Sequence, residues 1–118
     1  MPDGDRVRRM PIGRRGPARH ELPAVDDAGL AAARAADRVL AAAQASGVAR
    51  WIRYFEAMPD QLRDEEPRVL RQVALRARAA YGPKDSISDI LPADVTEPFL
   101  DAIDRLIKQL NRRDVGAA

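Results

Sequence analysis

Apolar residues recur at three- and four-residue steps along three stretches of the chain, separated by polar and charged residues. The first stretch runs from residue 26 to residue 58, the second from 67 to 81 and the third from 96 to 110. This period places apolar side chains on one face of an α-helix. No stretch has the strict alternation that is typical of a half-buried strand. The pattern therefore predicts an all-α fold, a small bundle of three main helices.

Acidic and helix-breaking residues set the expected ends of the first helix. Asp26 and Asp27 can accept hydrogen bonds from the free amides of a first turn, and their charges suit the positive end of the helix dipole. Pro59 is expected to end this helix. Gly47 costs about 1 kcal/mol relative to alanine inside a helix. It therefore leaves open a bend, a break into two helices or a close helix crossing at that point.

The other two helices have similar signals. A Gly-Pro pair at 82–83 is expected to end the second helix. Residues 86–89 have a Ser-x-x-Asp spacing like a capping box, which predicts a short extra helical turn. Thr96 is expected to cap the third helix, with Pro98 tolerated in its first turn.

The composition agrees with helix and limits the size of the fold. The chain has 118 residues, a mass of 13.0 kDa and no cysteine, so we expect one domain without disulfides or thiolate metal sites. Alanine occurs 22 times and arginine 18 times, and both residues favour helix. The same bias is typical of a GC-rich bacterial genome, so part of it need not reflect function.

Charge divides the chain into two parts, an N-terminal tail (residues 1–22) and a body (23–118). The tail carries a net charge of +3 and the body a net charge of −1, which together give the formal +2 of the whole chain. The tail is rich in proline and glycine, and its few apolar residues have no period, so we expect it to be disordered. Its arginines are Arg6, Arg8, Arg9, Arg14, Arg15 and Arg19.

No apolar segment follows the tail arginines as a secretory signal would require. No window reaches the 18 or so uninterrupted apolar residues of a membrane span. We therefore expect a cytoplasmic protein that makes no membrane contact.

Enzymatic chemistry has little support in the sequence. His20 is the single histidine, so a His-pair metal site and most catalytic triads are excluded. The acidic clusters lie at expected helix starts or on solvated faces, where capping explains them. We expect no enzyme activity, no cofactor, no metal and no small-molecule substrate.

The first hypothesis is a non-catalytic helical module that binds another protein or a second copy of itself through the long first helix. An unbroken helix of about 30 residues would span about 45 Å, more than the other helices can cover alone. The candidate interface residues are Leu30, Leu40, Trp51 and Leu75. Core packing is the favoured interpretation for Trp51, and a lone exposed leucine is ordinary for Leu75.

The alternative hypothesis is a small regulator that binds nucleic acid. The basic tail could neutralise phosphates, and a second set of arginines follows one face of the second helix. Against this, a helix-turn-helix through Gly82 would make residues 87–91 the reading helix, and this segment is short and has no arginine, asparagine or glutamine to read bases. The nucleic-acid candidates in the body are Arg68, Arg71 and Arg78, in addition to the six tail arginines.

Overall fold

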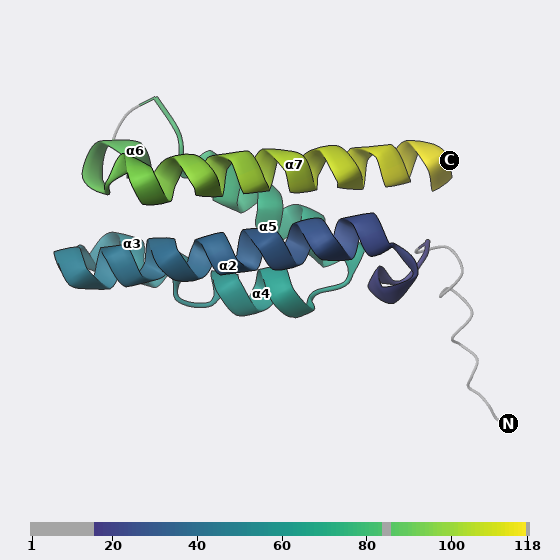
Figure 1. Cartoon of the computed structure of the whole chain (residues 1–118), viewed down its shortest axis with the longest axis horizontal. Coiled ribbons are helices and arrows are strands. Elements are labelled where there is room, and N and C mark those ends of the chain that lie inside the picture. The colour runs from purple at the N-terminus through teal and green to yellow at the C-terminus, as the bar shows by residue number, and fades with distance from the viewer. Residues whose placement is uncertain (1–15, 84–85, 118) are drawn as a thin grey trace, which may run out of the picture.

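The computed structural model describes residues 16–83 and 86–117, and side chains as far as Arg112. In this part of the chain all the regular structure is helical, so the predicted all-α fold is confirmed. Figure 1 shows the arrangement. The elements are a short 3-10 helix η2 (Arg19–Glu21) and the helices α2 (Pro23–Ser46), α3 (Ala49–Phe55), α4 (Met58–Asp64), α5 (Pro67–Ala79), α6 (Ile87–Ile90) and α7 (Ala93–Ala117).

The expected first helix is divided at Gly47. This residue has a φ of 70°, in the left-handed region that glycine adopts without strain. Its N–H donates to the carbonyl oxygen of Gln44 (3.2 Å), and the N–H of Val48 donates to that of Ala43 (3.3 Å). These two bonds are the Schellman pattern that closes a helix C-terminus. Gly47 is therefore a helix end, and three main helices do not describe the chain completely.

Two prolines occupy positions that differ from the prediction. Pro59, expected to end a helix, lies in the first turn of α4. Pro98 lies inside α7, because this helix begins at Ala93 and not at Thr96. Proline has no N–H to donate to the carbonyl of Asp94, four residues earlier. Nη2 of Arg38 donates to that oxygen instead, at 3.3 Å.

The predicted short turn between α5 and α7 is present as α6. Ser86 and Asp89 form the expected capping box, with the N–H of Ser86 donating to the Asp89 carboxylate at 3.3 Å. Thr96, expected to cap the last helix, is 1% exposed and lies within the second turn of α7. The first turn of α7 follows Pro92, whose carbonyl accepts from the N–H groups of Val95 and Thr96.

The core lies around the pair formed by α2 and α7, which run side by side in opposite directions (Figure 1). The buried face of α2 consists largely of alanine and glycine, which allow a neighbouring backbone to approach closely. The buried face of α7 supplies the larger side chains Phe99, Ile103, Leu106 and Leu110. Small residues on one helix thus face large residues on the other.

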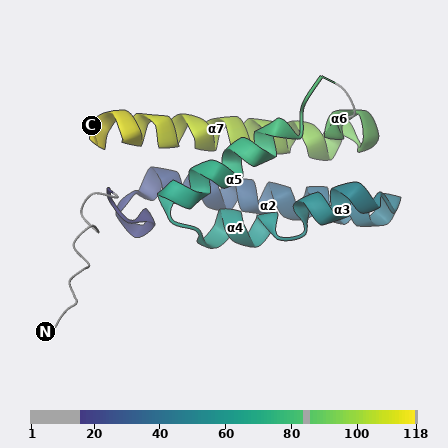
Figure 2. The ribbon, with the colours of Figure 1, turned by 180° about the vertical axis from the view of Figure 1, so that it is seen from behind.

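Helix α5 crosses the α2–α7 pair on the side opposite to the viewer of Figure 1, and Figure 2 shows it in front. It packs against α7 and α4, while α4 and α3 pack against α2. The folded part begins before the predicted boundary at residue 23, since Arg19 and Leu22 are each 4% exposed. The prediction of disorder for residues 1–15 lies outside the described residues.

Candidate interaction surface

The candidate site is the side of α5 that points away from the core. Leu70, Val73, Ala74 and Ala77 form the buried side of this helix. The opposite side carries residues at steps of four, three and four, which follow one line along a helix. We name it the α5 outer face; it consists of Arg68, Gln72, Leu75 and Ala79, all exposed.

An apolar side chain occupies the middle of this face. Leu75 is 49% exposed, and Val69, beside the face, is 39% exposed. Among the described residues the other large apolar side chain with comparable exposure is Ile90 on α6, at 48%. An isolated exposed leucine is common on protein surfaces. Leu75 differs in its setting, because it lies on a helix with four arginines and no acidic residue.

One arginine of α5 is held against α3. The guanidinium of Arg76 lies 4.6 Å from the ring centroid of Tyr54, a cation–π distance. Its Nη2 donates to the carbonyl oxygen of Tyr54 at 3.2 Å, and the Tyr54 hydroxyl donates to the carbonyl oxygen of Arg76 at 2.6 Å. The reciprocal bonds tie α5 to α3 and fix this edge of the exposed surface.

Two arginines on the other flank contact α7. Nη1 of Arg71 donates to Oδ1 of Asn111 at 2.6 Å, and Nε of Arg78 lies 3.0 Å from Oδ1 of Asp104. Arg68, in the first turn of α5, is exposed and forms no ion pair within the described part of the chain. Among the described residues, Arg68 is therefore the arginine of α5 whose guanidinium makes no contact of this kind.

The other predicted interface residues lie in the core or beside it. Trp51 is 2% exposed, and its ring packs edge-on against Tyr54 with centroids 5.2 Å apart. Leu40 is half-buried and packs against the core. Leu30 is half-buried on α2, outside the row of buried residues. The apolar side of α2, which we expected to face another chain, is covered by α7 and α4.

The residues predicted to bind nucleic acid also differ in where the structure places them. Arg68, Arg71 and Arg78 lie on α5 as expected. Arg6, Arg8, Arg9, Arg14 and Arg15 lie outside the described residues. Arg19 was assigned to a free tail, but its side chain is 5% exposed and is bound on two sides. It cannot contact a phosphate backbone without leaving this position.

Arg19 joins the start of the folded part to the junction of α4 and α5. Its Nε lies 2.7 Å from Oδ1 of Asp26, and its Nη1 donates to the carbonyl oxygen of Glu65 at 3.0 Å. Its backbone N–H donates to Oε1 of Glu66 at 2.9 Å. Glu65 is the C-cap of α4, so the guanidinium places positive charge at the negative end of that helix.

A glycine on α2 provides the space for this arginine. A Cβ at Gly29 would lie 2.5 Å from Nη2 of Arg19 and 3.1 Å from the carbonyl oxygen of Leu62. Nη2 is buried and has no hydrogen-bond partner among the described residues. The contact was not predicted from the sequence, although Gly29 is one signal of it, because it interrupts an alanine-rich helix where alanine would form helix better.

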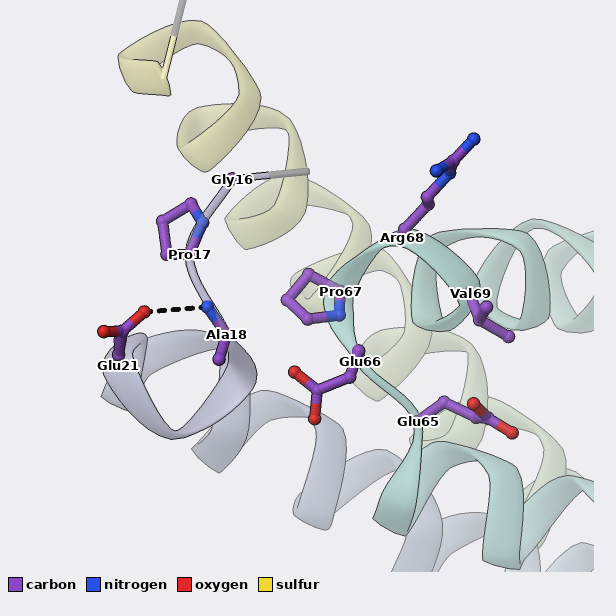
Figure 3. Close-up of a pocket in the computed structure, with 9 residues that line it drawn as sticks. All are labelled: Gly16, Pro17, Ala18, Glu21, Glu65, Glu66, Pro67, Arg68 and Val69. Carbon is purple, nitrogen blue, oxygen red and sulfur yellow. Dashed lines mark hydrogen bonds between the residues drawn. The ribbon is translucent and has the colours of Figure 1, made fainter. Parts of the chain in front are cut away.

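A hollow of about 470 Å³ lies between the segment before η2 and the start of α5. Glu21, Glu65 and Glu66 line it, together with apolar residues and Arg68. The carboxylates of Glu21 and Glu65 point away from each other, and Glu21 accepts from the N–H of Ala18 at 2.8 Å (Figure 3). The three carboxylates therefore do not converge on a single ligand position.

No group of three or more potential metal ligands lies together among the side chains that the structure describes, in residues 16–83 and 86–112. Several carboxylates have arginine partners: Asp26 pairs with Arg19, and Asp37 and Asp60 both pair with Arg63. No helix in these ranges is both long and apolar enough to cross a bilayer.

The comparisons with known proteins give no further guide to the site. No protein-family model matches the chain, no curated protein matches it, and no solved structure matches its fold.

Proposed function

We propose that the protein is a non-catalytic, cytoplasmic interaction module that binds another protein through the α5 outer face. The observation that carries the proposal is the exposure of Leu75, 49%, at the centre of the α5 outer face, which includes Arg68 and is flanked by the other three arginines of α5. Leucine and arginine on one exposed helix supply both an apolar contact and charged hydrogen-bond donors. The partners that we found for several carboxylates support a structural role for these groups rather than a catalytic one.

We place the binding surface on α5, whereas the sequence alone favoured the long first helix. The buried side of α2 is already covered within the chain. Trp51, which could have been an aromatic anchor, belongs to the core. Of the four interface candidates, Leu75 is therefore the most exposed.

Nucleic-acid binding is the second candidate function, favoured by the four arginines on α5. Three of these arginines already contact Tyr54, Asn111 or Asp104. Asp104 would also repel a phosphate backbone that lay along the α7 side of the helix. The exposed leucine does not contribute to phosphate contacts, so a protein partner accounts for more of this surface.

Photo-cross-linking from the α5 outer face tests the proposal. The photoreactive residue p-benzoylphenylalanine replaces Gln72, which is exposed beside Leu75. Irradiation of cells that carry this full-length chain should give a protein adduct. Leu75→Asp should abolish the adduct, and Ile90→Asp, at an equally exposed position on α6, should leave it unchanged.

Three results would contradict the proposal: no adduct, an adduct that persists with Leu75→Asp, or an adduct that consists of nucleic acid. The last result would support the second candidate function. Circular dichroism of both aspartate variants checks that the helical fold is retained.

A further inference from the structure

The exposed charge of α5 also indicates what kind of partner fits it. We propose that the partner presents an acidic amphipathic helix, which lies along α5 with an apolar side chain on Leu75 and carboxylates opposite the arginines. This inference rests on the proposed function, because it assumes that the α5 outer face binds a protein.

The sign of the charge on α5 is the first argument. The helix carries four arginines and no acidic residue. Asp104 of α7 neutralises Arg78 in part, at 3.0 Å, and Arg76 lies over the Tyr54 ring.

Arg68 is exposed and has no acidic partner among the described residues. Glu65 and Glu66 lie next to this end of α5, but the Arg68 side chain extends away from both of them (Figure 3). A partner with carboxylates that contacts α5 from Arg68 onward would therefore complement its charge.

The size of the apolar contact is the second argument. Covering the exposed half of one leucine contributes about a tenfold gain in affinity. That gain is too small to hold a complex alone, so the charged contacts must supply the rest. Gln72 and Ala79 lie on either side of Leu75, and both are exposed. The short side chain of Ala79 lets a partner backbone approach this end of the face closely.

The shape of the exposed line is the third argument. Arg68, Gln72, Leu75 and Ala79 follow one side of a helix of 13 residues, about 20 Å long. A straight row of this length matches one side of a second helix of similar length, which presents its own residues at steps of three and four.

A second copy of this chain fits the surface poorly. A symmetric dimer through the α5 outer face would bring Arg68 of each copy toward the arginines of the other α5, since both copies use the same patch. Like charges at such a contact disfavour association. The charge pattern therefore favours a different, acidic protein over self-association.

A designed peptide provides the probe. A fluorescein-labelled peptide of about 14 residues, held helical by a side-chain staple, carries leucines at steps of three and four, glutamates on either side of them and alanines elsewhere, to match the length of α5. Binding to the full-length protein is measured by fluorescence anisotropy. The control probes are the same peptide with lysine in place of glutamate and a short DNA duplex. We expect the acidic peptide to bind most tightly, and its affinity to fall as salt is raised.

Variants of the full-length protein locate the contact. Leu75→Asp and Arg68→Glu should each weaken acidic-peptide binding by about tenfold. Ile90→Asp and Arg34→Glu should change it by less than about twofold. Ile90 matches Leu75 in exposure, and Arg34→Glu changes the net charge as Arg68→Glu does, but on α2.

Equal binding of the lysine peptide, tighter DNA binding that Arg68→Glu weakens, or an unchanged affinity of Arg68→Glu for the acidic peptide would overturn the acidic-helix inference. The cross-linking at position 72 separates this failure from that of the proposed function. A Leu75-dependent protein adduct without acidic-peptide binding would reject only the acidic helix. Loss of both signals would reject the interaction module as well.

Discussion

The burial of Arg19 shows that the folded part of the chain includes the end of the predicted N-terminal tail. Arg19 lies in a stretch with a disorder-like composition, yet its guanidinium bonds to Asp26 and to the carbonyl of Glu65. Composition describes an average over many residues, whereas burial depends on one side chain that finds two acceptors. The sequence could therefore predict a basic tail, but not that its last arginine belongs to the fold.

Removing this guanidinium should destabilise the fold. We expect Arg19→Met to lower the free energy of unfolding by about 2 kcal/mol, because it breaks a partly buried ion pair and leaves the Glu65 carbonyl without its donor. Urea unfolding followed by circular dichroism measures the change. Arg34→Met, at an exposed arginine of α2, should stay within about 0.5 kcal/mol of the wild type. Equal effects of the two substitutions would contradict the role given to Arg19.

Replacing Gly29 with alanine should destabilise the fold, whereas the same replacement of an ordinary helical glycine stabilises it. Glycine to alanine within a helix normally stabilises by about 1 kcal/mol. At residue 29 the new Cβ would lie 2.5 Å from Nη2 of Arg19, so we expect Gly29→Ala to lower the free energy of unfolding. In an Arg19→Ala background the guanidinium is absent and the Leu62 carbonyl oxygen, at 3.1 Å, is the remaining close contact, so the destabilisation should shrink. A double-mutant cycle measures this coupling, and additive effects would show that the two residues are independent.

At the scale of the helices, the sequence predicts the elements better than their ends. The apolar period identified α5 and α7, and the Ser86–Asp89 spacing identified α6. The helix ends were less predictable, because a glycine is compatible with a bend or an end of a helix and a proline with the end of one helix or the start of the next. Gly47 could bend or end a helix, and the packing of α3 against α2 selected the end. Pro59 could end one helix or start the next, and it starts α4.

Tyr81 connects the end of α5 to the first turns of α7. Its hydroxyl donates to the carbonyl oxygen of Thr96, and its ring lies 6.5 Å from that of Phe99. We expect Tyr81→Phe to lower the free energy of unfolding by about 1 kcal/mol at neutral pH. Tyr54→Phe is the matched control, since it also removes a hydroxyl that donates to a backbone carbonyl. Urea unfolding at neutral pH measures both.

The same residue predicts a loss of stability in alkali. Burial raises the pKa of the Tyr81 hydroxyl in the folded protein, with a smaller opposing effect from the charge of Arg78. The unfolded chain therefore loses this proton first, at a pH near 10. Below that pH the contribution is fully present, and it declines as the pH rises toward the folded pKa. Between about pH 9 and pH 10.5 the wild type should lose more stability than Tyr81→Phe; equal losses would contradict this assignment.

At the scale of the whole molecule, α5 contributes to the core on one side and carries the candidate interaction surface on the other. α2 and α7 bury their apolar sides against each other, whereas α5 keeps Leu75 and Arg68 in solvent. The sequence predicted Leu75 and the arginines of α5 as candidates, because their positions on a helical wheel follow from the period alone. It could not predict that α2 would be covered, since that depends on how three other helices fold back onto it.

A single core should make the described part of the chain unfold as one unit. Trp51 is 2% exposed and belongs to the buried cluster that joins α2, α3, α4, α5, α6 and α7. Its fluorescence reports the local environment of α3, whereas circular dichroism at 222 nm reports helix throughout. We expect the two signals to give the same urea midpoint, as in a two-state transition. A lower midpoint for Trp51 would mean that α3 and its neighbours separate from the α2–α7 pair before the rest unfolds.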